Sequence, residues 1–213
     1  MTILEVKNLN LGFECEYSFR QALFDVSFKL ECGKMHALVG ESGCGKSVSA
    51  MSILRLLPKT AKITSGEIFY NGENLLIKSQ KDMQKIRGAK IALIPQDPMT
   101  SLNPLYTIGN QLLEVIKIHQ NLKGEEDIKK AIEALEAVQI PCAKERMKAY
   151  PHEFSGGMKQ RAIIAMALCC NAEILIADEP TTALDVTIQA QIMNLLKEIQ
   201  KTRNTSILLI TQD

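Results

Sequence analysis

The feature of this sequence that most restricts its fold is a glycine-rich segment, residues 40–47, with the sequence GESGCGKS. It fits the pattern G-x-x-x-x-G-K-[ST], in which the glycines let the backbone wrap around a phosphate and turn successive N–H groups toward it. The apolar run 35–39 before it predicts a β-strand, and residues 47–57, which end before Pro58, predict a helix. A strand, such a loop and a helix in this order predict an α/β fold with a phosphate-binding loop.

We expect the whole loop to contribute to binding the phosphates of a nucleotide. Lys46 is long enough to reach the β- and γ-phosphates, and the hydroxyl group of Ser47 is an oxygen ligand of the kind that Mg²⁺ prefers. Cys44 has a small side chain and is expected to face away from the ligand. The expected nucleotide-binding residues of the loop are Gly40, Glu41, Ser42, Gly43, Cys44, Gly45, Lys46 and Ser47.

A second acidic site follows the apolar run 174–177, where Asp178 and Glu179 stand side by side. A parallel strand delivers its C-terminal residues to the edge of the sheet where ligands bind. Asp178 is therefore a candidate ligand of Mg²⁺, through water, and Glu179 is a candidate to polarise the water that attacks the γ-phosphate. Alone, such a pair could equally be a helix cap and a solvated charge. A phosphate loop in the same chain favours the catalytic interpretation and predicts a P-loop NTPase core.

The order of apolar runs and helical patterns predicts how the chain is organised. Strands that alternate with helices imply a mostly parallel sheet with both faces covered. Residues 1–30 show β-type patterns and predict an N-terminal antiparallel β portion. Because the pattern turns helical after Pro95, we expect residues 98–160 to form an inserted helical lobe, with residues 1–97 and 161–213 forming the α/β nucleotide-binding core.

Two helical segments have a predicted buried side. A helix over 187–203 is expected to pack against the sheet, and a helical pattern covers 108–148. The apolar stripe expected on the first is Ile188, Ile192, Leu195 and Ile199. The stripe expected within the second is Ile128, Ile132, Leu135 and Val138.

Composition and charge exclude several classes of protein. A net charge of +1 gives no reason to expect nucleic acid or an anionic membrane as partner. The longest apolar run, 162–170, is about nine residues, whereas a membrane-spanning helix needs about 20. The N-terminus has no signal-peptide pattern. The six cysteines contain no C-x-x-C pair, which is typical of reduced, mostly buried thiols in a cytosolic protein.

A phosphate loop alone leaves GTPases, small kinases, motor ATPases and transporter ATPases open, although no N-K-x-D guanine motif is present. Residues 154–158, FSGGM, resemble the signature loop of the ABC ATPase family. This loop begins a long predicted helix near Met158 and forms a second anion site from backbone N–H groups. The resemblance implies head-to-tail pairing of two subunits, with ATP between the phosphate loop of one subunit and Ser155, Gly156 and Gly157 of the other.

Three further positions resemble the same family. Gln96, after the predicted strand 90–94, matches the glutamine that contacts Mg²⁺ and the attacking water. Residues 182–185, TALD, match the D-loop, whose Asp185 would contact the opposite subunit. Tyr17 stands where the family usually has an aromatic residue that stacks on adenine, a contact worth about 1–3 kcal/mol. The aromatic residues that compete with Tyr17 for this role are Phe13 and Phe19.

Two longer segments resemble one subfamily, the ATPase subunits of oligopeptide, dipeptide and nickel importers. They are 96–104, QDPMTSLNP, and 150–161, YPHEFSGGMKQR, in which Met158 replaces the glutamine of most ABC proteins. The resemblance implies a peripheral, ATP-hydrolysing subunit at the cytoplasmic face of the inner membrane. Its implied partners are a second ATPase subunit, identical or related, two transmembrane permease subunits and an extracytoplasmic solute-binding protein. Peptides, nickel and other small solutes are alternative cargoes.

Two other functions stay open at this point. The first is a soluble ABC-type ATPase that acts on nucleic acid or the ribosome, although such proteins usually carry two cassettes or a long coiled-coil insertion, and the sequence shows neither. The second is a regulatory subunit that binds ATP and hydrolyses it poorly. Gln212, which stands where the family usually has a histidine, slightly favours this second alternative. Glu179, the candidate to polarise the attacking water, opposes it.

The chain departs from the subfamily at its end. The last core strand of the subfamily is usually followed by Thr-His-Asp, where this chain has Thr211, Gln212 and Asp213. The family histidine contacts the γ-phosphate, and Gln212 can donate a hydrogen bond there but cannot carry a proton. We therefore expect weaker hydrolysis at this site, in an asymmetric pair of subunits. Relatives continue beyond the residue equivalent to Asp213, so we also expect a truncated C-terminal end.

Overall fold

The computed structural model describes residues 1–120, 122, 124–182 and 184–212, and its strands form two four-stranded sheets. The first sheet is antiparallel, in the order β2-β1-β4-β5, and the second is parallel, in the order β3-β8-β7-β6. The predicted α/β class, with an N-terminal antiparallel portion and a parallel core sheet, is confirmed. The strands of the first sheet are β1 (Thr2–Cys15), β2 (Ser18–Glu31), β4 (Ala61–Tyr70) and β5 (Glu73–Asn74). The strands of the second are β3 (Met35–Val39), β6 (Ile91–Ile94), β7 (Ile174–Asp178) and β8 (Ser206–Thr211).

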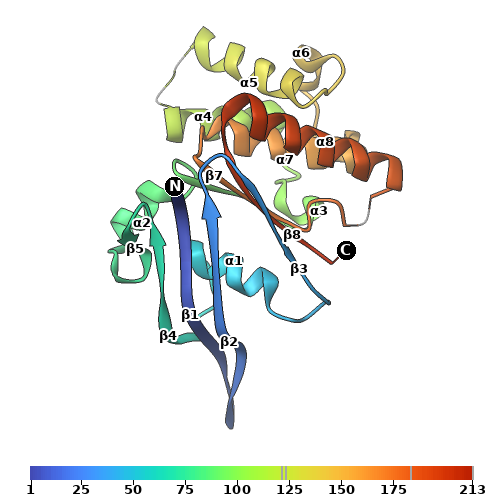
Figure 1. Ribbon diagram of the computed structural model, residues 1–213. Helices are drawn as coiled ribbons and strands as arrows, with labels where there is room; N and C mark the ends of the chain where they lie inside the picture. Colours follow the sequence, from blue (N-terminus) through green and yellow to red (C-terminus); the bar gives the residue numbers. More distant parts are fainter. Residues whose placement is uncertain (121, 123, 183, 213) are drawn as a thin grey trace.

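The long β1–β2 hairpin explains an irregular apolar pattern in the sequence. Val6 and Leu9 are three residues apart, yet both are buried on the same side. The register shifts between them, from Val6 opposite Phe28 to Leu9 opposite Val26. A bulge that adds one residue to a strand restores the alternation of the two faces. Figure 1 shows this hairpin projecting at the end of the molecule opposite the helices α4 to α6.

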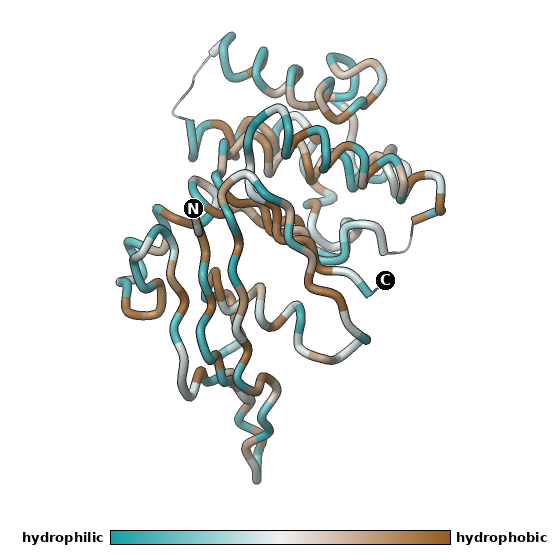
Figure 2. Tube along the Cα trace, in the orientation of Figure 1, coloured by the Kyte–Doolittle hydropathy of each residue, from teal (hydrophilic) through white to brown (hydrophobic). Residues whose placement is uncertain are grey.

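The parallel sheet separates two apolar cores, and alternate residues of each strand enter different ones. Along β7, Ile174 and Ile176 pack with α1 and the antiparallel sheet, whereas Leu175 and Ala177 pack with α7 and α8. All five residues of β7 are buried, as expected for a parallel strand covered on both faces. Figure 1 shows α1 between the two sheets, and Figure 2 shows apolar residues concentrated in the strands of the parallel sheet.

The helices gather mainly on one side of the parallel sheet. Helices α4, α5, α7 and α8 share a single apolar core with that face of the sheet. Within α8, Ile192, Leu195 and Ile199 are buried in this core and Ile188 is partly buried against it, in agreement with the predicted stripe. The helices are α1 (Lys46–Leu54), α2 (Gln80–Ile86), α3 (Pro98–Ser101), α4 (Ile108–Gln120), α5 (Glu125–Ala137), α6 (Ala143–Arg146), α7 (Gly156–Cys169) and α8 (Val186–Arg203), with short 3₁₀ turns at Leu75–Ile77 and Pro151–Glu153.

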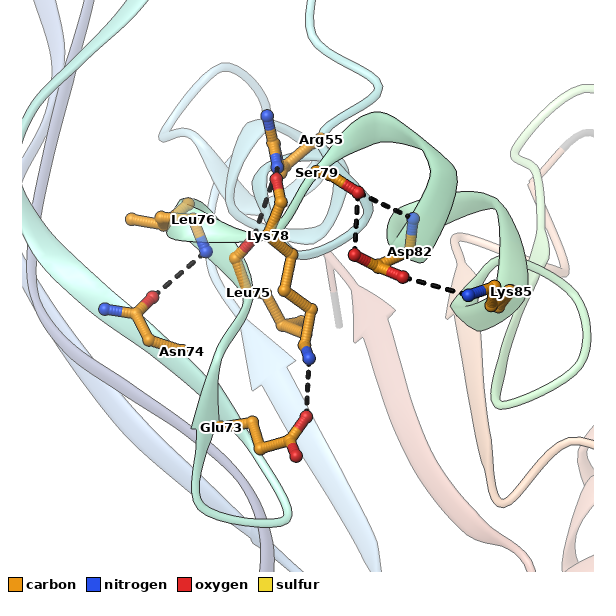
Figure 3. Close-up of polar contacts among 9 residues, drawn as sticks. All are labelled: Arg55, Glu73, Asn74, Leu75, Leu76, Lys78, Ser79, Asp82 and Lys85. Carbon is orange, nitrogen blue, oxygen red and sulfur yellow. Dashed lines mark hydrogen bonds and ion pairs between the residues drawn. The ribbon is translucent and has the colours of Figure 1, made fainter.

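Helix α1 is shorter than predicted, and its end is fixed by a polar contact with the connection to α2. It ends at Leu54, because Arg55 adopts a left-handed conformation (φ 52°) and leaves the helix. The side chain of Arg55 donates hydrogen bonds to the carbonyl oxygens of Leu75 (3.3 Å) and Lys78 (2.6 Å), as Figure 3 shows. Helix α2 begins after Ser79, whose hydroxyl oxygen accepts a hydrogen bond from the backbone N–H of Asp82.

The helical region shows two more differences from the sequence-based expectations. In α5, Leu135 is buried but Ile128 is 47% exposed, so the predicted stripe is buried only toward the C-terminal end of the helix. Helix α7 begins at Gly156, two residues before Met158, because Ser155 caps it. The domain boundary predicted at residue 160 falls inside α7, which runs without a break from one predicted part into the other.

The cysteines are more exposed than expected. All six are free; Cys169 is buried and Cys170 is partly buried. The four exposed cysteines are Cys15, Cys32, Cys44 and Cys142. They lie at strand ends and in loops, outside the two apolar cores. Within the part of the chain that the structure describes, no helix combines the length and apolar character needed to cross a bilayer.

Candidate nucleotide site

The candidate site lies at the C-terminal edge of the parallel sheet, where one strand leads into the glycine-rich loop and the other three present a polar residue. The glycine-rich loop begins with Gly40 directly after β3, and Asp178 ends β7. Gln96 lies two residues after β6, and Gln212 follows β8. Because the strands are parallel and adjacent, these residues meet at one edge, although they are far apart in the sequence.

The loop 40–47 is held in shape by glycine at a position that no other residue would fit. Gly45 has φ +96°, and a Cβ atom there would lie 2.5 Å from Cδ2 of Leu23 on β2. The Nζ atom of Lys46 donates hydrogen bonds to the carbonyl oxygens of Gly40 (2.6 Å) and Glu41 (2.7 Å). The loop therefore curls around the lysine ammonium group, which places a positive charge beside its backbone N–H groups.

We expected Cys44 to face away from the ligand, but its side chain turns toward the inside of this loop. Its sulfur atom accepts a hydrogen bond from Nζ of Lys46 at 3.8 Å. A Cβ atom on Gly40 would lie 2.9 Å from the same sulfur. The thiol turns toward the lysine because the tight curl of the loop brings residues 40, 44 and 46 together.

Ser47 and Asp178 form the first link between the loop and the acidic strand. The hydroxyl group of Ser47 donates a hydrogen bond of 2.8 Å to Oδ1 of Asp178. Asp178 is only 2% exposed, and burial raises the pKa of its carboxyl group. The neighbouring charge of Glu179 also raises this pKa, while the hydrogen bond from Ser47 and the charge of Lys46 oppose the shift. A cation placed here would relieve the cost of the buried negative charge.

The residues present fit a Mg²⁺ ion. Ser47 and Asp178 offer a hydroxyl and a carboxylate oxygen at hydrogen-bond distance from each other, and Gln96, whose Nε2 atom is bonded to the neighbouring Glu179, also carries an amide oxygen. The described residues contain no group of three or more His, Cys, Asp or Glu side chains that could hold a metal. Mg²⁺ normally keeps water ligands and binds through one or two protein oxygens and substrate phosphates, so this sparse set of ligands suits it.

Glu179 is the centre of a second cluster. It is 6% exposed and has φ 44°, a left-handed conformation that is unusual for a residue other than glycine. Its Oε2 atom accepts a hydrogen bond from Nε2 of Gln96 at 2.7 Å. The Nε2 atom of Gln212 donates to Oε1 at 3.0 Å and to Oε2 at 3.2 Å. The structure thus brings together all three residues that the sequence analysis assigned to catalysis.

Sequence reasoning missed one further contact of this carboxylate. The hydroxyl group of Thr182 donates a hydrogen bond of 3.0 Å to Oε2 of Glu179. Thr182 was predicted only as part of the D-loop. A threonine hydroxyl group three residues from a carboxylate in a turn is close enough to bond it. The spacing of Thr182 and Glu179 could therefore have predicted this contact.

The signature segment is placed apart from this cluster. Ser155 caps α7, and its hydroxyl oxygen accepts a hydrogen bond from the N–H of Met158 at 3.3 Å. A Cβ atom on Gly157 would lie 2.9 Å from Cγ2 of Ile188, so glycine lets the start of α7 pack closely on α8. Ser155 and Gly156 are exposed. Among the described residues, no hydrogen bond joins 155–157 to the loop 40–47. This exposed helix start presents backbone N–H groups of the kind that bind anions.

Tyr17 and Asp185 also lie outside the cluster. Tyr17 is 94% exposed at the tip of the β1–β2 hairpin. Leu23, which contacts the loop at Gly45, is six residues farther along, a distance of about 20 Å on an extended strand. Asp185 is exposed just before α8 and makes no capping hydrogen bond with its side chain. Ala183, also predicted to belong to the D-loop, lies outside the described residues.

The two competing aromatic residues are also placed by the structure. Phe13 is partly buried against the core beneath the antiparallel sheet. Phe19 is partly exposed, and its ring covers Gly12 on the same hairpin.

Comparison with known proteins gives concordant matches. A family model described as "ABC transporter" matches residues 23–182. The chain is 52% identical over 212 residues to a probable peptide ABC transporter ATP-binding protein, y4tR, of Sinorhizobium fredii, and 52% identical over 212 residues to the dipeptide transport ATP-binding protein DppD of Bacillus subtilis. It is 47% identical over 211 residues to the oligopeptide transport ATP-binding protein OppD of Escherichia coli. Each match covers 99% of this chain, but the chain spans only 63%, 63% and 62% of those relatives.

Solved structures match over almost the whole chain. A dimeric post-hydrolysis state of the ATP-binding cassette MJ0796, bound to ADP and Pi, has 30% sequence identity and a TM-score of 0.86, and the match covers 99% of this chain and 88% of that one. The structure of cbiO1 from Clostridium perfringens, part of the ABC transporter complex cbiONQ, has 29% identity and a TM-score of 0.80, with coverage of 100% and 79%.

Proposed function

Because this chain belongs to the ABC transporter family, we propose that it is the ATP-binding and ATP-hydrolysing subunit of a transporter that imports peptides. The relatives named for peptide, dipeptide and oligopeptide transport support this cargo. The proposal keeps ATP as the nucleotide, which the neighbour bound to ADP and Pi supports, and Mg²⁺ as the metal, which the oxygen groups of Ser47 and Asp178 suit.

The observation that carries the proposal is the convergence of two clusters at one sheet edge. The phosphate loop reaches the acidic strand through the bond from Ser47 to Asp178. The next residue along, Glu179, is held by the amide groups of Gln96 and Gln212. Phosphoryl transfer needs charge neutralisation and positioning more than covalent chemistry, and this edge offers both.

In the proposed mechanism, residues 40–47 and Lys46 hold the phosphates. Ser47, Gln96 and Asp178 would hold Mg²⁺, which would supply positive charge to neutralise the phosphate oxygens. Glu179 accepts a hydrogen bond from the attacking water and polarises it. Gln212 donates a hydrogen bond toward the γ-phosphate but cannot carry a proton, so we propose that this is the weaker site of an asymmetric pair.

The remaining site residues take part through pairing of two subunits. Ser155, Gly156 and Gly157 are proposed to close over the γ-phosphate held by the opposite subunit, since this exposed helix start is not bonded to its own chain's loop. Asp185 is proposed to contact the opposite subunit. Tyr17 is proposed to stack on adenine, which requires the exposed hairpin tip to bend toward the base. The neighbour that forms a dimer supports this pairing.

A surface near Gln96 suits the permease subunits. Four large apolar side chains that follow it in the sequence are exposed: Met99, Leu105, Tyr106 and Ile118. Tyr106 and Ile118 line the same surface pocket, and exposed apolar residues that gather in this way mark sites of interaction. We propose that residues 98–160 form a lobe whose outer surface contacts two permeases at the cytoplasmic face of the inner membrane. A solute-binding protein on the other side would deliver the peptide.

The proposal is tested by reconstituting the protein in lipid vesicles with the permeases encoded beside its gene. Phosphate release should require MgATP and the permeases, and it should rise when peptide and the matching solute-binding protein are added. A Lys46→Ala variant should release no phosphate and serves as the control. If phosphate release does not depend on peptide or permeases, but rises with nucleic acid or ribosomes, the transporter proposal is overturned in favour of the soluble alternative.

A further inference from the structure

The carboxylate group of Glu179 is held by three donors, and they are not equivalent. Oε2 accepts hydrogen bonds from Gln96 (2.7 Å), Thr182 (3.0 Å) and Gln212 (3.2 Å). Oε1 accepts one, from Gln212 at 3.0 Å. The two glutamines come from the ends of other strands, 83 and 33 residues away, whereas Thr182 is three residues away.

Thr182 is tied to Glu179 by the backbone as well as by its side chain. The N–H group of Thr182 donates a hydrogen bond of 3.1 Å to the carbonyl oxygen of Glu179. The turn is anchored on both sides. The N–H group of Glu179 donates a hydrogen bond of 3.0 Å to the carbonyl oxygen of Ile210 on β8. The side chain of Gln189 on α8 donates one of 3.3 Å to the carbonyl oxygen of Thr181. The backbone of Thr182 is therefore fixed beside Glu179, and the hydroxyl group could leave the carboxylate only by rotation of its own side chain.

The two glutamines have no such tie. Each is a flexible side chain with a second partner in the proposed function: the amide oxygen of Gln96 would bind Mg²⁺, and Nε2 of Gln212 would donate to the γ-phosphate. With these partners bound, Gln212 would share its donor with the phosphate and Gln96 would have to follow its amide oxygen, whereas the bond from Thr182 depends on no ligand.

We propose that Thr182 is a positioning residue that anchors Oε2 of Glu179 during hydrolysis, so that Oε1 faces the attacking water. This inference rests on the proposed ATPase function. A carboxylate anchored through one oxygen has a fixed direction for the other. That direction matters, because a displacement of about 1 Å can cost on the order of a hundredfold in rate.

The test compares Thr182→Val, which keeps the shape of the side chain but cannot donate, with Thr182→Ser, which keeps the hydroxyl group. Thr182 is exposed in the single chain, so neither change opens a cavity. We expect Thr182→Val to lower kcat by about tenfold, the effect of one lost hydrogen bond to a charged group, with KM changed less than about twofold. Thr182→Ser should recover most of the rate. The matched control is Thr181→Val, because the side chain of Thr181 makes none of the hydrogen bonds to Glu179 found among the described residues.

The same assay separates this inference from the proposed function. The parent protein and Glu179→Gln are measured first, with the partner subunits present. If the parent hydrolyses ATP and Glu179→Gln does not, the proposed function stands, and a parental kcat for Thr182→Val then overturns the role of Thr182 alone. A parent that releases no phosphate overturns both. A rise in KM in place of the fall in kcat, or a failure of Thr182→Ser to recover, would also contradict the role.

A crystal structure of the full chain with Mg²⁺ and a nonhydrolysable ATP analogue gives a readout that does not depend on turnover. We expect the Thr182 hydroxyl group to remain within hydrogen-bond distance of Oε2, with the amide of Gln96 turned to the ligand. In Thr182→Val the carboxylate should occupy more than one orientation. A hydroxyl group rotated away from Glu179 in the parent would overturn the inference.

Discussion

Replacing Glu179 by glutamine tests the assignment of the base most directly, because the change removes the charge and keeps the shape. The structure predicts that the fold tolerates it. The amide oxygen of the new side chain can take the place of Oε2 and accept from Gln96 and Thr182, which lie 2.7 and 3.0 Å away. The new NH₂ group then faces Nε2 of Gln212, 3.0 Å from the present Oε1, and Gln212 must turn its own amide to offer an oxygen.

The magnitudes follow from these contacts. Reorienting this one hydrogen bond should lower the unfolding free energy by at most about 1 kcal/mol. For a chain of this size that is a shift in Tm of about 2–4 °C. Loss of a general base lowers kcat by about 10²- to 10⁴-fold, or about 2.7 to 5.4 kcal/mol in the activation barrier. The phosphate loop is untouched, so ATP affinity should change by no more than a few-fold.

The assay measures three quantities on the same preparations. Phosphate release with the partner subunits gives kcat, titration with a fluorescent ATP analogue gives affinity, and size-exclusion chromatography with MgATP follows the paired subunits. We expect Glu179→Gln to bind ATP, to release almost no phosphate and to lengthen the lifetime of the closed pair. Turnover at the parental rate, with ATP binding intact, would show that Glu179 is not the base.

Three other changes test separate parts of the molecule. Gln212→His places an imidazole beside the catalytic carboxylate and should raise phosphate release on the order of tenfold, and an unchanged rate would remove the idea of a weakened site. Burial lowers the pKa of His119, whose ring lies over Gly88, below the ordinary value of 6.5. His119 should therefore contribute fully to the unfolding free energy above pH 6.5, and its contribution should fall as the pH drops through the folded pKa. In urea denaturation, the unfolding free energy of His119→Phe should fall less between about pH 7.5 and 5.5 than that of the parent. Gly157→Ala would place a methyl group 2.9 Å from Ile188, cost about 1–3 kcal/mol of stability and reduce partner-dependent turnover, while ATP binding by the single chain stays unchanged in the fluorescence titration.

Local pattern was enough to locate the main elements of the site. The loop 40–47 and the pair that follows β7 are each written in consecutive residues, and a run of apolar residues before each predicts the strand that presents it. The parallel core sheet was predictable for the same reason, since alternating strands and helices leave few other arrangements. Errors arose at element ends. Helix α1 stops at Leu54 because the side chain of Arg55 bonds the connection before α2, a contact between segments about 20 residues apart that helix propensity does not describe.

The directions of some individual side chains did not follow the local pattern. Cys44 turns toward Lys46 because the loop is tightly curled, and Ile128 is exposed because the lobe offers it no partner surface, although both positions fit their motifs. Tyr17 fits its place in the sequence, yet the long hairpin carries it to an exposed tip.

Short stretches of sequence were enough to nominate candidates for the chemistry: residues that could hold phosphate, residues that could hold Mg²⁺ and a carboxylate that could act on water. These properties belong to individual side chains and their immediate neighbours. How these residues meet follows from the packing of the folded chain. The order β3-β8-β7-β6 and the register of these strands set Ser47 against Asp178, 131 residues away, and surround Glu179 with two glutamines and a threonine. A hydrogen bond between such distant residues depends on which strands are neighbours, and strand neighbours are selected by the packing of the whole chain.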